Sequence, residues 1–263
     1  MRLAAFDLDG TLLNRDNRIG EANADALHAL IARGVVCAPA TARGYRAAMR
    51  LFAEHGITPA AIASGGADVR LADGTVVQQL ELPGGFVHEL AAIADRERWN
   101  ITFVGAERTL RRQAEVPDWL RDSPRPGIEI VPELAGANLS GLLTALVEAD
   151  PGHIALSALD GWREEVATKT AITFSGHTLI TFTNAAADKG TALKALCAAL
   201  EIDPSQAVAF GDSEVDLPMF AVAGIAVAMA NGTEEAKAAS THIAPPADED
   251  GVARMVDELS AES

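Results

Sequence analysis

The sequence predicts an α/β protein, built on a Rossmann-like, doubly wound parallel sheet into which an α+β domain is inserted. Near the N-terminus, short and mostly apolar runs alternate with stretches that carry apolar residues at helical spacing, and this alternation returns in the last third of the chain. Such alternation is typical of a parallel sheet with helices on both faces. Between the two blocks the pattern changes. We therefore expect a core domain over 1–83 and 184–263 and an inserted cap domain over 84–183.

The first block predicts three strands separated by two helices. In chain order these elements are expected over 2–6, 22–33, 35–40, 46–56 and 60–63. Gly34 and Gly56 mark the ends of the helices, since glycine commonly terminates them. Residues 69–80 then predict a β-hairpin, because Asp73-Gly74 is a strong signal for a tight turn.

The last block predicts further strands of the same sheet and the helices that cover it. The helices are expected over 191–200, 216–223, 234–240 and 248–259, and the strands over 207–210, 225–229 and 241–244. Asp188 precedes the first of these helices at a position where its side chain can cap free backbone N–H groups.

The inserted segment mixes helical and strand patterns without a regular order. Its expected helices lie over 88–98 and 140–150, and its expected strands over 100–105, 128–133, 153–159 and 177–183. This mixture predicts an α+β unit with its own core, distinct from the parallel sheet.

Charge and cysteine content exclude several classes of partner. The 263 residues include 37 acidic and 21 basic side chains, which gives a formal net charge of −16. Nucleic acid and anionic membranes require clustered cations, so we expect neither as a partner, whereas a small anion held by one local cation stays possible. Cys37 and Cys197 form no CxxC pair and are expected to be buried thiols. Acidic residues stand at 7 and 9, where a signal peptide would need an apolar run, and the apolar run over 221–230 is too short to span a bilayer. We therefore expect a soluble cytoplasmic protein.

Two acidic motifs follow predicted strands. Asp7-Leu8-Asp9-Gly10-Thr11 comes after the first strand, and Gly211 to Asp216 comes after the strand over 207–210. Ligand sites of open α/β sheets lie at the carboxyl ends of strands, so these carboxylates should converge. Two unit charges 4 Å apart repel by about 4 kcal/mol at an effective dielectric of 20, which favours a bound cation. Oxygen donors without a histidine or cysteine cluster favour Mg²⁺, with Mn²⁺ or Ca²⁺ as substitutes.

Two further motifs can bind an anion beside that cation. Lys189-Gly190 opens a predicted helix, and Thr41-Ala42-Arg43 follows the second strand. Each is ordinary when taken alone, as a lysine in a first turn or a threonine that caps a helix. Together with the carboxylates they provide what phosphoryl transfer requires: a nucleophile, a proton shuttle and cations for the phosphoryl oxygens.

These four motifs, in this order, resemble those of the haloacid dehalogenase (HAD) superfamily, and specifically its Cof-type sugar phosphatases with a large C2-type cap. The match runs over the whole chain. The family's DxDGT stands at 7–11, its Thr-Gly-Arg at 41–43, its lysine before glycine at 189–190, and its GDSxxD at 211–216. The resemblance implies a Mg²⁺-dependent phosphatase that acts on small phosphorylated metabolites, foremost sugar phosphates.

The resemblance also implies a role for each matched residue. Asp7 would be the nucleophile that forms an aspartyl phosphate, and Asp9 the general acid and base. The metal would be held by Asp7, the main-chain carbonyl of Asp9, Asp212 and Asp216. The phosphate would be bound by Thr41, Lys189 and the main-chain amides near Leu8 and Ala42. Arg43 and Arg46, which lie in and after the second motif, are our candidates for contact with the substrate or the cap.

Three positions depart from the family pattern. Ala42 replaces a glycine, Gly65 replaces an asparagine in a Ser-Asn-Gly sequence, and Val215 replaces an asparagine that usually reaches the phosphate. The change at Val215 predicts weaker phosphate binding, by about 1–3 kcal/mol if a polar partner is left unpaired. Two other functions therefore stay open: a phosphate-binding or regulatory protein without catalysis, and a phosphomutase that passes the phosphoryl group to a second hydroxyl. A response-regulator receiver fits less well, because it lacks the paired DxD motif and a large insert.

Overall fold

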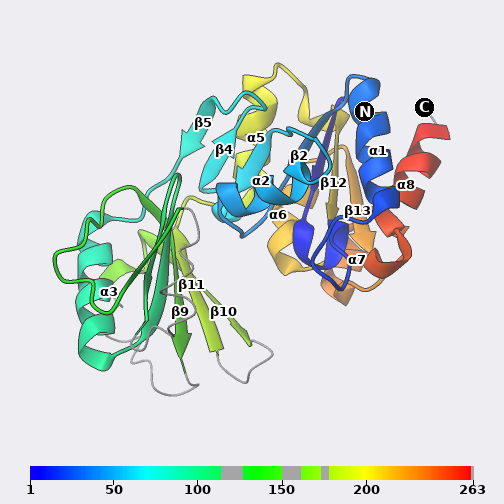
Figure 1. Cartoon of the computed structure of the whole chain (residues 1–263). Helices are drawn as coiled ribbons and strands as arrows, with labels where there is room; N and C mark the ends of the chain where they lie inside the picture. The colour runs from blue at the N-terminus through cyan, green and yellow to red at the C-terminus, as the bar shows by residue number, and fades with distance from the viewer. Residues whose placement is uncertain (114–126, 150–160, 173–177, 262–263) are drawn as a thin grey trace. The chain divides into compact units, whose positions relative to one another are not determined.

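The computed structural model describes residues 1–113, 127–149, 161–172 and 178–261 (Figure 1). The chain divides into two compact units. The first unit comprises Met1–Gln79 and Asp188–Ser263, and the second comprises Leu80–Ala187. The second unit is therefore an insertion into the first in the order of the chain.

A parallel sheet forms the centre of the first unit, with strand order β14-β13-β12-β1-β2. Its strands are β1 (Leu3–Phe6), β2 (Val36–Pro39), β12 (Ala207–Gly211), β13 (Ile225–Met229) and β14 (His242–Ala244). The early and late blocks of the sequence meet where β1 pairs with β12, with Phe6 opposite Phe210. The prediction that the two blocks form one open sheet is therefore confirmed.

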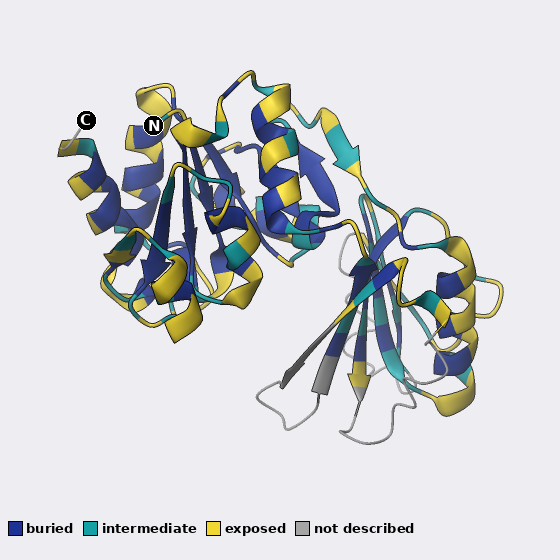
Figure 2. Ribbon diagram, turned by 180° about the vertical axis from the view of Figure 1, so that it is seen from behind, coloured by how far each residue is buried: buried dark blue, intermediate teal, exposed yellow. Residues whose placement is uncertain are grey.

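Helices cover both faces of this sheet, because alternate residues along a strand point to opposite faces. Figure 2 shows the strands of this sheet almost entirely buried. One core contains Ala4 and Phe6 together with α1 (Glu21–Ala32), α2 (Tyr45–Ala53) and α8 (Gly251–Ala261). The opposite core contains Leu3 and Ala5 together with α5 (Lys189–Ala199), α6 (Leu217–Phe220) and α7 (Glu234–Ala239). The doubly wound arrangement is the predicted one.

The third predicted strand joins a small sheet of order β3-β4-β5. These strands are β3 (Ala61–Ala63), β4 (Asp68–Arg70) and β5 (Val76–Gln79). β3 also runs beside β2 through one parallel bridge between Ala40 and Ile62. β4 and β5 form the predicted hairpin, and its turn is closed by the Asp73 side chain, which accepts a hydrogen bond from the Thr75 N–H.

The second unit contains a mixed sheet of order β10-β11-β9-β6-β7-β8 among the described residues. Its strands are β6 (Asn100–Gly105), β7 (Thr109–Arg112), β8 (Ile128–Val131), β9 (Leu142–Ala149), β10 (Val166–Ile172) and β11 (Thr178–Asn184). The helix α3 (Gly84–Glu97) packs its apolar residues, including Phe86 and Leu90, against Phe103 and Val147 of this sheet. The fold class predicted from the sequence, a parallel core with an inserted α+β region, is confirmed. The boundaries at 83 and 184, and the role of the insert as a cap, stay predictions.

One predicted element of the insert is wrong. Leucine and alanine dominate residues 140–150 and predict a helix, but the segment contains the strand β9. Val147 lies opposite Ile101 of β6 on one side and Ile180 of β11 on the other. Pairing with two neighbours overrides the local helix propensity, which amounts to only tenths of a kcal/mol per residue. The sequence patterns also do not predict β7 and β10, and the strand expected over 153–159 lies outside the described residues.

Both cysteines are buried and free, as expected. Burial raises the pKa of the Cys37 thiol to about 12, so this side chain stays protonated and unreactive. Among the helices that the structure describes, none combines the length and the apolar content that a bilayer crossing requires.

Candidate active site

The carboxyl ends of three neighbouring strands bring the predicted motifs together. Asp7 directly follows β1, Thr41 follows β2 closely, and Asp212 directly follows β12. The Asp7 N–H donates to the Phe210 carbonyl at 2.9 Å, and the Thr41 N–H donates to the Ile62 carbonyl at 2.9 Å. Strand pairing thus continues up to the first residue of each of these two motifs. Parallel strands end at one edge, and this is where open α/β sheets bind their ligands.

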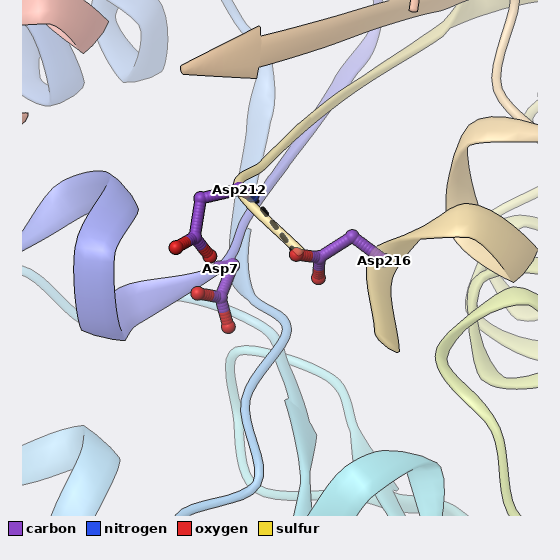
Figure 3. Close-up of side chains that lie close together, drawn as sticks. All are labelled: Asp7, Asp212 and Asp216. Carbon is purple, nitrogen blue, oxygen red and sulfur yellow. Dashed lines mark hydrogen bonds between the residues drawn. The ribbon is translucent and has the colours of Figure 1, made fainter. Parts of the chain in front are cut away.

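Three carboxylates meet at this edge. Asp7, Asp212 and Asp216 each offer one oxygen, and these oxygens all lie within 4.8 Å of one another. Figure 3 shows the three carboxyl groups close to one another. Gly10 permits this approach: its φ is +84°, and a Cβ atom there would overlap the Asp212 carboxylate. Glycine adopts such a conformation without the steric cost that other residues incur.

Lys189 supplies the ammonium group opposite these carboxylates. Its Nζ donates to Asp7 Oδ1 and to Asp216 Oδ1, at 2.6 Å in each case, and the residue is only 3% exposed. Lys189 is the first residue of α5, and Asp188 caps this helix by accepting hydrogen bonds from the Gly190 and Thr191 N–H groups. The predicted cap is confirmed, and it fixes the position of the Lys189 backbone at the start of the helix.

Asp216 is fully buried and both of its oxygens accept hydrogen bonds. Oδ1 accepts from Lys189, while Oδ2 accepts from the N–H groups of Asp212 and Ser213 at 3.0 and 3.1 Å. The side chain therefore connects the lysine to the loop that carries Asp212. Asp216 is also one of the three carboxylates that could hold a metal ion.

Burial and crowding shift the protonation of this cluster. Burial raises the pKa of Asp7 to about 7, with a further upward contribution from Asp216, although Lys189 opposes the change. Burial also raises the pKa of Asp212 to about 6, again with repulsion from Asp216. Burial opposes the charged form of Lys189, but the Asp7 and Asp216 carboxylates outweigh it and raise the pKa of the ammonium group. The lysine stays charged, and its single positive charge does not balance the carboxylates around it.

The donor set fits a divalent cation. Three carboxylates and one ammonium leave an excess of negative charge among groups that are mostly removed from water, which is unfavourable without a counter-ion. The donors of this cluster are carboxylate oxygens, and these suit Mg²⁺ or Mn²⁺. The cluster is thus consistent with the metal site of the predicted family.

Asp9 lies at the exposed rim of the site rather than among the three clustered carboxylates. Its side chain is 55% exposed and pairs with Arg43, whose side chain is 30% exposed. Arg43 Nε donates to Asp9 Oδ2 at 2.9 Å, and Arg43 Nη2 donates to Asp9 Oδ1 at 2.5 Å. The two acidic residues of the DxD motif therefore have different surroundings: Asp7 is buried and Asp9 is accessible to a ligand.

The other predicted site residues differ in their surroundings. Thr41 is buried, and its Oγ1 accepts from the Arg43 N–H at 3.1 Å, which leaves the hydroxyl hydrogen for a ligand. Leu8 is buried in the core beneath the site, whereas Ala42 is exposed next to Thr41. Arg46 is exposed in the first turn of α2. Val215 is 40% exposed on the turn between Asp212 and Asp216.

The contacts of three residues in the site neighbourhood are not indicated by the sequence patterns. Asn231 donates to the Gly10 carbonyl at 2.8 Å and accepts from the Ala247 N–H, so it steadies the loop after Asp7. Asn17 accepts a hydrogen bond from Arg43 at 3.3 Å. Ser64 follows β3 with a left-handed φ of +52°, and its N–H donates to the Arg43 carbonyl. Each lies far in sequence from its partner, so no local pattern indicates the contact.

Comparison with known proteins identifies the family. The sequence pattern of the haloacid dehalogenase-like hydrolases matches residues 4–256. The chain therefore belongs to this family, as the four motifs predict, and it is a phosphatase-type hydrolase. It is 29% identical over 248 residues to a protein named HMP-PP phosphatase from Yersinia enterocolitica, an alignment that covers 90% of this chain and 86% of the relative.

Solved structures show the same fold. A haloacid dehalogenase-like hydrolase from B. subtilis superposes with a TM-score of 0.80 at 23% identity, over 98% of this chain and 100% of that one. A sugar phosphatase of HAD subclass IIB superposes with a TM-score of 0.77 at 20% identity, over 99% of both chains. At these identities the likeness establishes the architecture, including the inserted region.

Proposed function

We propose that this protein is a Mg²⁺-dependent phosphomonoesterase that hydrolyses small phosphorylated metabolites, foremost sugar phosphates, through an aspartyl phosphate on Asp7. The observation that carries the proposal is the group formed by buried Asp7, Asp216 and Lys189 with half-buried Asp212 at the carboxyl edge of the sheet. A carboxylate nucleophile beside a cation site and an ammonium group matches the needs of phosphoryl transfer, in which charge develops on the phosphoryl oxygens.

In the first step, a carboxylate oxygen of Asp7 attacks phosphorus and the bond from phosphorus to the leaving oxygen breaks. Asp9 gives a proton to the leaving alkoxide, and its exposed position at the rim suits contact with the leaving group. Lys189 and the Thr41 hydroxyl bind phosphoryl oxygens. Bound Mg²⁺ would supply positive charge to the same oxygens, held by Asp7, Asp212 and the Asp9 carbonyl with support from Asp216.

In the second step, Asp9 accepts a proton from water as that water attacks the aspartyl phosphate. The bond between phosphorus and Asp7 breaks, inorganic phosphate leaves, and the Asp7 carboxylate is restored. Asp9 is thus the acid of the first step and the base of the second. Lys189 keeps the Asp7 carboxylate in place through both steps by its hydrogen bond to Oδ1.

Release of inorganic phosphate tests this proposal against its alternatives. Purified protein would be incubated with p-nitrophenyl phosphate and a panel of sugar phosphates, with Mg²⁺ and with excess EDTA. HMP-PP belongs in the panel because a relative is named for it. Metal-dependent phosphate release supports a phosphatase. An isomeric phosphate ester formed without phosphate release would indicate a phosphomutase, and the absence of both would indicate a binding protein.

A further inference from the structure

Arg43 holds the Asp9 carboxylate by two hydrogen bonds, one to each oxygen. Nε bonds Oδ2 and Nη2 bonds Oδ1, at 2.9 and 2.5 Å. A guanidinium that binds both oxygens of a carboxylate restricts its orientation as well as its position. Asp9 lies in the turn after β1 that contains Gly10, and its side chain is half-exposed. Without the contact to Arg43, this side chain would populate several rotamers.

The backbone of Arg43 is itself fixed on both sides. Its N–H donates to Thr41 Oγ1 at 3.1 Å, and its carbonyl accepts from the Ser64 N–H at 2.8 Å. Ser64 adopts a φ of +52°, a left-handed conformation that is uncommon for a residue with a side chain and that clusters at functional sites. The turn after β3 thus fixes the position of the Arg43 backbone.

The guanidinium end of Arg43 is steadied by a second loop. Nη2 also donates to Asn17 Oδ1 at 3.3 Å. Asn17 lies in a loop closed by pairing between Leu13 and Ile19, and within it the Asn14 side chain accepts hydrogen bonds from the Asp16 and Arg18 N–H groups. Loops after two different strands therefore hold the two ends of Arg43.

We propose that Arg43 is a positioning residue that orients the Asp9 carboxylate toward the leaving group, and that Asn17 supports it. The inference rests on the proposed function, in which Asp9 is the acid and base. The competing role for Arg43 is direct contact with the phosphoryl group or the rest of the substrate. Its contacts favour positioning, because Nε and Nη2 both donate to Asp9 and Nη2 donates to Asn17 as well.

Leaving-group dependence tests this role. kcat/KM would be measured for phenyl phosphate, whose leaving group needs a proton, and for p-nitrophenyl phosphate, whose leaving group needs little help. For Arg43→Ala we expect kcat/KM of the phenyl ester to fall about ten-fold further than that of the nitrophenyl ester, with KM little changed. Arg43→Lys should recover part of the loss, and Asn17→Ala should show a smaller loss of the same kind. Arg50→Ala, on the exposed side of α2, is the matched control and should behave like the unaltered protein.

An equal fall for both esters, with a higher KM and weaker inhibition by inorganic phosphate, would overturn the inference in favour of substrate binding. A measurement that does not depend on catalysis separates the role of Arg43 from the proposed function. Crystal structures of the unaltered protein and of Arg43→Ala should show one Asp9 conformer in the first and several in the second. One unchanged conformer in both would refute positioning. If the unaltered protein releases no phosphate from these esters or from the panel of sugar phosphates, the proposed function fails, and the conformers of Asp9 still decide the role of Arg43.

Discussion

Two ion-paired groups lie on the same edge of the parallel sheet, and they differ in how far water reaches them. The Lys189 and Asp216 side chains are 4% and 0% exposed, whereas those of Arg43 and Asp9 are 30% and 55% exposed. Within the buried group each charge depends on its neighbours, and burial raises the pKa of Asp7 to about 7. In the exposed pair, water competes with each partner for hydrogen bonds. The pair therefore contributes little to the free energy of folding. Under the proposed function, the nucleophile belongs to the buried group, and the proton carrier belongs to the exposed pair.

The largest effect on activity should appear when Asp7, the proposed nucleophile of the buried group, is changed. Asp7→Asn is expected to lower phosphate release by at least ~10³-fold, because a carboxamide cannot attack phosphorus at a useful rate. The fold should persist, since the substitution keeps the shape of the side chain. Phosphate release with Mg²⁺ and the thermal unfolding midpoint would be compared with those of the unaltered protein. More than a trace of activity in this variant would refute Asp7 as the nucleophile.

Removal of the buried ammonium should affect both activity and stability. Lys189→Gln is expected to lower kcat by roughly 10²–10³-fold, because one source of positive charge on the phosphoryl oxygens is lost. It should also lower the free energy of unfolding of the metal-free protein by about 3 kcal/mol, since Asp7 and Asp216 then lack their buried partner. Urea unfolding measures the second effect. Lys237→Gln, which breaks only the pair with Glu234 on α7, is the matched control and should change neither quantity by much.

The raised pKa values predict a pH-dependent metal affinity. Burial raises the pKa of Asp7 to about 7 and that of Asp212 to about 6, and a cation binds the ionised carboxylates. Protons therefore compete with Mg²⁺ as the pH falls through 7 and 6, and affinity should rise with pH over this window. Calorimetric titration should give a dissociation constant at least ~10-fold larger at pH 5.5 than at pH 7.5. Equal affinity at the two pH values would exclude these carboxylates as the titrating ligands.

The smallest effect is expected when the exposed pair is broken and only stability is measured. Arg43→Ala should change the free energy of unfolding by less than ~1 kcal/mol, the range typical of solvent-exposed ion pairs. Urea unfolding of this variant beside Lys189→Gln would compare the two groups directly. A loss as large as that of Lys189→Gln would mean that the rim pair is as integral to the fold as the buried group.

The local signals of the first unit are strong enough to predict it from the sequence. Apolar runs, glycine stops and the Asp188 cap act over a few residues, so they identify strands, helices and the loops that follow them. Because parallel strands end at one edge, the convergence of Asp7, Thr41 and Asp212 follows from the predicted order of strands and helices. The insert is harder to predict: the leucine- and alanine-rich segment of β9 has a helical composition, and only its two neighbouring strands make it extended.

The sequence by itself therefore determined the fold class, the four motifs and the kind of chemistry they support, since all of these depend on short-range patterns and on the order of strands. The tertiary structure alone decided which carboxylates are buried and which is exposed, that Lys189 lies between Asp7 and Asp216, and that Arg43 pairs with Asp9 and Asn17. Such contacts join residues distant in the chain, and the energy of a charge depends on the water and partners around it. Neither property is recorded in the local sequence.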